Sequence, residues 1–139
     1  MKMTDKTLIR FGVAVPEKLL RDFDRQVEEK GIPNRSEALR QLIRNSISER
    51  RWAQGEGVVY GSLTISYNHH AREVSSVLTD VQHNFGDVII CTNHVHADND
   101  HCLEVIMVKG KAHRVKSLVD LLSGVKAVNN LSPVITSIL

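Results

Sequence analysis

Residues 87–109 read DVIICTNHVHADNDHCLEVIMVK, a stretch that predicts a β-hairpin. Both ends are rich in apolar and β-branched residues, whereas the middle, residues 97–101, is a short polar run typical of a hairpin loop. In a strand with ~3.3 Å of rise per residue, the side chains of His94 and His96 point to one face, about 6.6 Å apart. The returning strand then brings Cys102 beside His96. The hairpin therefore predicts two imidazoles and one thiolate close enough to share a metal ion.

Two other residues bear on this candidate site. His83, upstream of the hairpin, offers a further imidazole. It favours a metal site over the alternative, a half-exposed edge strand that happens to carry histidines beside a buried structural cysteine. Cys91 has the opposite strand parity from His94 and His96. We therefore expect Cys91 to face away from the metal, as a small hydrophobic residue of the core.

Length and charge divide the chain into two parts. Its 139 residues suffice for one domain, or for two small domains that stabilise each other by oligomerising. Residues 1–50 carry eleven Lys or Arg and eight Asp or Glu, a net charge of +3, whereas residues 51–139 carry a net of −1. All seven histidines lie after residue 68. The first part is thus the candidate for binding a polyanion, and the second for binding metal or protons.

Two cysteines, with no signal peptide and no long apolar stretch, predict a cytoplasmic protein with reduced thiols.

The second part of the chain alternates strands and helices in the order βαββαβ. The predicted strands cover residues 58–67, 87–96, 102–109 and 125–138, and the predicted helices cover residues 71–83 and 112–123. This order predicts an α+β fold of the ferredoxin-like arrangement, in which two helices cover one face of a four-stranded antiparallel sheet. Because the other face stays uncovered, we expect this part of the chain to oligomerise.

The first fifty residues predict a strand followed by two helices. Apolar side chains alternate along residues 8–15, which indicates a strand with one face to bury. Pro16 suits the first position of a helix that ends at Gly31, and Asn34 and Glu37 form a capping box at the start of the next helix. Two glycines interrupt the pattern at residues 51–57, so we place a linker there, between domains of residues 1–50 and 58–139.

A lone strand has unpaired backbone groups, and a second copy of the chain would supply its partner. The pattern over residues 7–50 resembles the ribbon-helix-helix family of dimeric DNA-binding proteins. By that resemblance, the paired strands enter the major groove with Arg10, Gly12 and Ala14 outward, and Arg10 is the leading base contact because arginine can bind guanine through two hydrogen bonds. The start of the second helix, with Arg35 and Ser36, suits a DNA phosphate; an ordinary helix cap is the alternative interpretation.

The whole chain resembles the nickel-responsive regulators of bacteria, both in its domain order and in the spacing of His83, His94, His96 and Cys102. The resemblance implies a homotetramer, a dimer of dimers with one Ni(II) per subunit. The metal would be held by His94, His96 and Cys102 of one chain and by His83 of another. The metal-loaded protein would bind a palindromic operator in double-stranded DNA and repress nickel-uptake genes.

The chemistry of these donors agrees with the resemblance. Three imidazoles and one thiolate can give a square-planar field, which suits Ni(II) or Cu(II), whereas Zn(II) draws its ligands toward a tetrahedron. Affinity alone favours copper over nickel, so geometry has to select the metal. The family also implies a weaker cation site, which Glu37 matches, although Gln41 stands where a second carboxylate is common. Gln82 and Glu104 match family positions that orient the nickel ligands, and Tyr67 and His69 match a segment that becomes ordered in the family when metal binds.

Two other functions fit parts of this pattern. Ferredoxin-like domains of this topology also bind small metabolites at their interfaces, so a ribbon-helix-helix regulator gated by a metabolite, or by another metal, is one alternative. A site of Cys and His could also belong to a metalloenzyme, which needs an open coordination position and a nearby acid or base. Four protein ligands leave no vacancy for such chemistry in a square plane, so we expect no enzyme.

Overall fold

The computed structural model describes residues 7–137, which form two compact units that divide between Leu42 and Ile43. The first unit contains helix α1 (Glu17–Glu29) and the beginning of helix α2 (Arg35–Gln54). Pro16 is the N-cap of α1, with ψ of 142°, and not its first helical residue as the sequence predicts. Its extended ψ directs the preceding chain away from the helix axis, while its fixed φ of −57° still suits the helix entry.

The turn between the two helices follows the prediction. Lys30 caps α1, and Gly31 adopts a left-handed conformation with φ of 62°, which a residue without a side chain tolerates most easily. At the start of α2, the Asn34 side chain accepts a hydrogen bond of 2.9 Å from the backbone N–H of Glu37. This bond satisfies one of the donors that a helix start leaves without an intrahelical partner.

The predicted strand over residues 8–15 is not formed in the single chain. Residues 8–16 carry no helix or strand, and the apolar side chains of Phe11 and Val13 are 69% and 64% exposed. A strand exists only when its backbone pairs with another strand, and none of the described strands pairs with this segment. The apolar face that the alternating pattern predicts is therefore present in sequence but uncovered in one copy of the chain.

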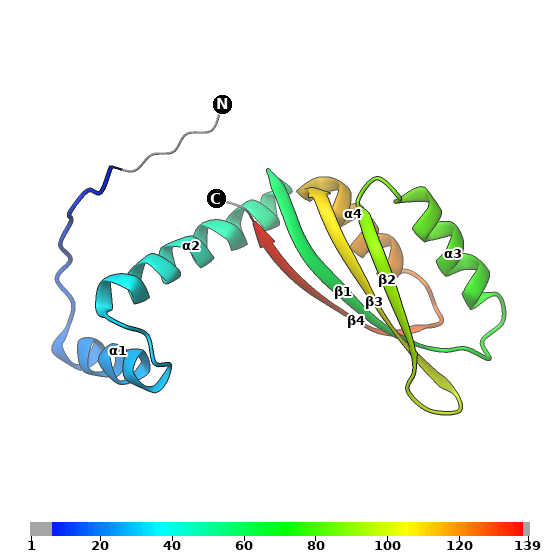
Figure 1. Cartoon of the computed structure of the whole chain (residues 1–139), viewed down its shortest axis with the longest axis horizontal. Coiled ribbons are helices and arrows are strands. Elements are labelled where there is room, and N and C mark those ends of the chain that lie inside the picture. Colours follow the sequence, from blue (N-terminus) through cyan, green and yellow to red (C-terminus); the bar gives the residue numbers. More distant parts are fainter. Residues whose placement is uncertain (1–6, 138–139) are drawn as a thin grey trace. The chain divides into compact units, whose positions relative to one another are not determined.

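The second unit has the predicted ferredoxin-like arrangement (Figure 1). Its elements follow the order βαββαβ, and the antiparallel sheet has the strand order β2-β3-β1-β4. Helices α3 and α4 lie on one side of this sheet (Figure 1). The bounds are β1 (Val58–Asn68), α3 (Val74–Asn84), β2 (Ile89–His96), β3 (His101–Lys111), α4 (Ala112–Ser123) and β4 (Val128–Ser137). The end of the predicted last strand, Ile138, lies outside the described residues.

The core lies between the sheet and its two helices. Alternate residues of β1 and β3, including Leu63, Ile65 and Ile106, are fully buried on the helix-covered face, and they pack against Leu118 and Leu122 of α4. Burial of such side chains contributes about 1.5–3 kcal/mol each. The same alternation places Glu104, Cys102 and Tyr67 on this face, toward one end of the sheet.

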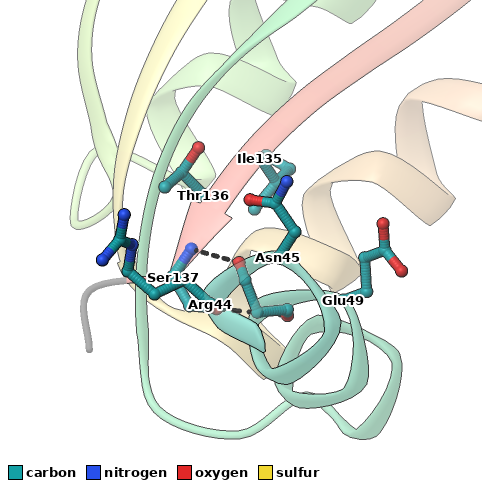
Figure 2. Close-up of a pocket in the computed structure, with 7 residues that line it drawn as sticks. Arg44, Asn45, Glu49, Ile135, Thr136 and Ser137 are labelled. Atoms are coloured by element: carbon teal, nitrogen blue, oxygen red, sulfur yellow. Dashed lines mark hydrogen bonds between the residues drawn. The ribbon is translucent and has the colours of Figure 1, made fainter. Parts of the chain in front are cut away.

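Helix α2 continues beyond the predicted domain end at residue 50, and its last turns belong to the second unit. Trp52 packs against the core of that unit, and the backbone N–H of Ala112 donates to the carbonyl of Gly57. The hydroxyl of Ser48 accepts a hydrogen bond of 2.9 Å from the backbone N–H of Ser137, at a hollow between α2 and the end of β4 (Figure 2). These bonds attach the end of α2 to the sheet, whereas the exact domain limits stay a prediction.

Candidate metal centre

The hairpin of β2 and β3 brings His96 and Cys102 together, as the sequence predicts. The two residues are direct partners in the antiparallel register, and Cys102 Sγ lies 3.4 Å from His96 Nδ1. His94 pairs with Glu104 on the same face, and the rings of His94 and His96 have centroids 5.0 Å apart. Cys102 is fully buried, whereas both histidines are exposed to solvent at the tip of the hairpin. One thiol and two imidazoles therefore meet where the core opens to solvent.

A polar network orients His94. Its Nδ1 lies 3.2 Å from both the Tyr67 hydroxyl and the Glu104 carboxylate, so the opposite ring nitrogen, Nε2, is left for a metal. The Tyr67 hydroxyl donates to Glu104 at 3.1 Å. Burial of the phenol, with the nearby Glu104 carboxylate as the second cause, raises the pKa of Tyr67 well above its ordinary value. Tyr67 thus stays a neutral hydrogen-bond donor.

The network reaches helix α3 through Gln82. The Gln82 amide nitrogen donates to Glu104 at 3.1 Å, and its amide oxygen accepts from Thr92 at 3.3 Å. Glu104 is 8% exposed, so its carboxylate carries its hydrogen bonds in a largely dry environment. Tyr67 and Glu104 therefore contact His94, and Gln82 binds Glu104; the resemblance assigns an orienting role to Gln82 and Glu104.

A third imidazole joins the pair of His96 and Cys102. His69 Nδ1 lies 3.7 Å from Cys102 Sγ, and one donor atom from each of these three residues falls within 4.8 Å of the others. The sequence resemblance places His69 in a segment that becomes ordered when metal binds, and it does not predict the approach of His69 to the sulfur. The signal is present in the strand order: β1 pairs with β3, and its register places Tyr67 opposite Cys102 two residues before His69.

His83 and His94 do not belong to this group of three within the described residues. His83 lies near the end of α3 and is exposed. It lines a hollow that also contains Gln82 and Cys91. The prediction for Cys91 is half right: its register partner is Met107, on the face opposite to the histidines, but Cys91 is exposed and not part of the core. The reason is that β2 is an edge strand, and the sheet face that Cys91 shares carries no covering helix.

The donor set suits a borderline divalent metal. Thiolate and imidazole are ligands for zinc, copper, iron or nickel, and the hard ions magnesium and calcium prefer oxygen. The His96 and Cys102 donors stand 3.4 Å apart, close to the separation of adjacent ligands around one ion. Glu104 and Tyr67 supply the hydrogen-bonded support that a ligating histidine normally has. The residues present therefore fit a metal ion of the nickel, copper or zinc kind.

The candidate DNA-binding residues lie in the first unit. Arg10, Gly12 and Ala14 are exposed, as are all residues of the unpaired segment including Phe11 and Val13, so their outward position stays a prediction. Ser36 is exposed in the first turn of α2. Arg35 forms two hydrogen bonds of 2.6 Å with the Asp24 carboxylate in the DNA-free chain, and its contact with a DNA phosphate stays a prediction. The hydrogen bonds from Arg35 are the largest cause of a lowered pKa at Asp24, and the positive charge of Arg35 lowers that pKa further.

No helix within residues 7–137 is long and apolar enough to cross a membrane.

Comparison with known proteins agrees with both units. Residues 60–136 match the family model described as the NikR C-terminal nickel-binding domain, and residues 9–49 match the ribbon-helix-helix protein model of the CopG family. Among the similar proteins are relatives provisionally named nickel-responsive regulators. One from Geotalea uraniireducens is 48% identical over 93% of each chain, and one from Methanocaldococcus jannaschii is 44% identical over 88% of this chain and 87% of its own. A further relative, from Pyrococcus abyssi, is 48% identical over 94% of each chain.

The matched regions contain the residues on which the sequence resemblance rests. His83, His94, His96 and Cys102 fall within the nickel-binding model, and Arg10, Arg35 and Ser36 fall within the ribbon-helix-helix model. The family is one of transcriptional regulators, a kind of protein that is not an enzyme. With its ribbon-helix-helix region followed by a ferredoxin-like nickel-binding domain, the chain belongs to the family of nickel-responsive regulators.

Proposed function

We propose that this chain is a nickel-dependent repressor in which one Ni(II) per subunit controls binding to a palindromic operator. The observation that carries the proposal is the meeting of His96 and Cys102 beside His94, at the solvent-exposed end of a buried core. A buried thiol with imidazoles at its open side is a site for a soft or borderline metal, and it lies within the region that matches the nickel-binding model.

The proposed ligand set is His94, His96 and Cys102 of one chain with His83 of another. Three donors on one hairpin leave a fourth position of a square plane open. His83 is exposed on α3, on a different element from the three hairpin donors, which supports its use by a neighbouring copy. A ligand that comes from another chain makes the metal sensitive to how the subunits are arranged.

The proposed assembly is a homotetramer built as a dimer of dimers. In the first unit, the uncovered apolar side chains of Phe11 and Val13 support pairing of residues 8–15 with a second chain as a two-stranded ribbon. In the second unit, the uncovered sheet face carries Val95 and Val134, which are 54% and 67% exposed. Two different self-complementary surfaces close into a tetramer with two-fold symmetries. We assign residues 1–50 to the DNA-binding domain, residues 58–139 to the metal-binding domain and residues 51–57 to the connection.

The DNA contacts follow from that ribbon. Arg10 from each chain would face the major groove and read a guanine, with Gly12 and Ala14 allowing close approach of the backbone. The first turn of α2, with Ser36, would bind a phosphate through its backbone N–H groups. A two-fold symmetric ribbon reads a palindromic site, and occupation of such a site near a promoter represses the gene. Nickel-uptake genes are the natural target, because their repression closes a feedback loop on the metal.

The test is operator selection and binding with the full-length protein. Fragments selected from random DNA in the presence of Ni(II) should share a palindrome, and affinity for it should fall at least about fivefold when the metal is removed, the lower end of usual allosteric coupling. A Cys102→Ala variant serves as the metal-blind control. If Ni(II) binds but leaves the selection and the affinity unchanged, the chain is not a nickel-gated regulator. Gating by a metabolite or by another metal would then be tested in its place.

A further inference from the structure

Arg114, in the first turn of helix α4, binds the segment that ends helix α3. Its Nε donates to one carboxylate oxygen of Asp87 at 3.0 Å, and its Nη2 donates to the other at 3.1 Å. The same Nη2 donates to the backbone carbonyl of Asn84, the last residue of α3. The guanidinium also lies over the ring of Phe85, with Cζ 3.9 Å from the ring centroid. One side chain of α4 therefore holds a backbone carbonyl, an aromatic ring and a carboxylate of the neighbouring segment.

The electrostatics of the two helices favour this use of Arg114. The start of a helix carries partial positive charge, so a cation in the first turn of α4 opposes the dipole of its own helix. That first turn, residues 112–115, contains no acidic residue. At the end of α3 the same cation is favourable, because the last carbonyl groups carry partial negative charge and lack intrahelical partners. Arg114 thus stabilises the end of α3 and not the start of α4.

The segment that Arg114 holds begins directly after His83. Asn84, whose carbonyl accepts from Arg114, is the next residue in the chain, and Phe85 anchors the segment in the core. The start of α3 differs, because it is capped by Glu73 with a left-handed φ of 65°, which residues with a side chain rarely adopt. Arg114 therefore anchors α3 at the end that carries His83.

A ligand at this place needs such an anchor. His83 is exposed in the last turn of α3, and the ends of helices fray. A metal accepts an imidazole nitrogen only at about 2.0–2.1 Å, and the groups of a functional site have to be held to within about 0.5 Å of their working positions. A guanidinium fixed by a ring and by two carboxylate bonds restricts the movement of the backbone beside His83.

We propose that Arg114 is a positioning residue for nickel, which holds the end of α3 so that His83 can bind the metal of another subunit. The inference rests on the proposed function, because Arg114 is given a role only through His83. The contacts of Arg114 described above lie in residues 84–87 and not in the hairpin that carries the other three ligands. Loss of Arg114 therefore weakens the fourth ligand and leaves the hairpin donors in place.

The test is a double-mutant cycle in the full-length protein, with Arg114→Ala, His83→Ala and the double variant. Competition with a chromophoric chelator measures the affinity for Ni(II). We expect Arg114→Ala to lower this affinity at least about fivefold when His83 is present, and less than about twofold when His83 is already replaced. A general loss of structure would lower the affinity equally in both backgrounds. Equal losses, or no loss in either background, would overturn the assignment.

Two further variants control for folding. Lys116→Ala removes a half-buried cation of the same helix that donates to the carbonyl of Ala53 instead, and it should bind Ni(II) like the wild type. Asp87→Asn weakens the grip of Arg114 at an exposed carboxylate, where folding tolerates the change. It should reproduce part of the Arg114→Ala loss, again only when His83 is present. A loss in Lys116→Ala as large as in Arg114→Ala, or wild-type affinity in Asp87→Asn, would reject the positioning role.

The absorption spectrum at saturating Ni(II) identifies the ligand that is lost. Arg114→Ala should keep the thiolate-to-nickel charge-transfer band, because Cys102 remains bound, while its ligand-field bands shift toward those of His83→Ala. Wild-type ligand-field bands in Arg114→Ala, beside shifted bands in His83→Ala, would reject the inference alone. Wild-type affinity and bands in His83→Ala would reject the ligand set of the proposed function, and the role of Arg114 with it.

Discussion

The Gln82 amide nitrogen donates to the Glu104 carboxylate at 3.1 Å, and this bond joins helix α3 to the ligands on the hairpin. Gln82 directly precedes His83 on α3, while the other oxygen of Glu104 lies 3.2 Å from His94 Nδ1. One carboxylate thus links the element that carries His83 with a histidine of the same chain's site. If His83 serves the metal of another subunit, each chain connects two metal centres through this carboxylate.

Replacing Glu104 should weaken nickel binding without removing a ligand. In Glu104→Gln the neutral amide no longer offers His94 a charged acceptor, and a partner of this kind typically changes metal affinity by about 10–100-fold. Chelator competition measures the change. Asp80→Asn, an exposed acid on the same helix as Gln82, is the control and should bind nickel like the wild type. Equal affinity in Glu104→Gln and wild type would mean that the network does not tune the metal.

Substitution of Cys102 and substitution of Cys91 should have different effects on nickel binding. Cys102 lies in the group of metal donors, whereas Cys91 is exposed on the opposite face of β2. We expect Cys102→Ala to abolish tight nickel binding and the thiolate-to-nickel charge-transfer band, and Cys91→Ala to retain both. Persistence of the band without Cys102, together with its loss without Cys91, would reverse the assignment.

The sequence predicts the second unit well because its signals are local and periodic. Alternation along β3 fixes which residues face the core, and a polar loop of five residues fixes the pairing of His96 with Cys102. The sequence does not predict features that depend on which strands, distant in the chain, lie side by side in the sheet. The approach of His69 to the sulfur requires knowing that β1 lies beside β3, and the exposure of Cys91 follows from the edge position of β2. The strand over residues 8–15 fails in one chain for a related reason, since the pattern predicts a face to bury but not where its partner comes from.

The raised pKa of Tyr67 predicts a tyrosine that resists ionisation. The chain has two tyrosines, so Tyr60→Phe leaves Tyr67 as the only phenol to titrate. Burial and the Glu104 carboxylate favour the neutral form, so tyrosinate absorbance should rise only well above pH 10, the ordinary range. Because the folded pKa is raised, this stabilisation is complete below about pH 10 and is lost as the pH rises toward the folded value. An ordinary titration curve in folded Tyr60→Phe would contradict the buried network.

Base reading and phosphate binding should respond to different arginines. Arg10→Ala is expected to reduce discrimination between operator and random DNA by about 1–3 kcal/mol, the usual worth of a two-bond contact to a base. Arg35→Ala should weaken all sequences alike and lower the salt dependence by about one phosphate contact. Because Arg35 pairs with Asp24, Asp24→Asn is the matched variant: releasing the guanidinium should strengthen binding to all sequences at low salt. Equal losses on operator and random DNA in Arg10→Ala would remove it from base reading.

The coupling between metal and DNA is the decisive property, and His83 should control it. Nickel raises operator affinity only if it binds the DNA-competent arrangement of subunits more tightly than the others, and operator DNA must then raise nickel affinity by the same factor. A coupling of about 1–3 kcal/mol, roughly 5–150-fold, is usual.

His83 is exposed on α3 and outside the donor group of its own chain, so removing it should leave the metal-free protein's DNA binding unchanged. We therefore expect His83→Ala to retain the operator affinity of the metal-free protein and to lose most of the nickel-dependent increase. Titrations of operator and of nickel, each with and without the other ligand, measure both sides of the cycle. Full coupling in His83→Ala would show that the metal acts within one chain, and unequal factors on the two sides would show that a further state contributes.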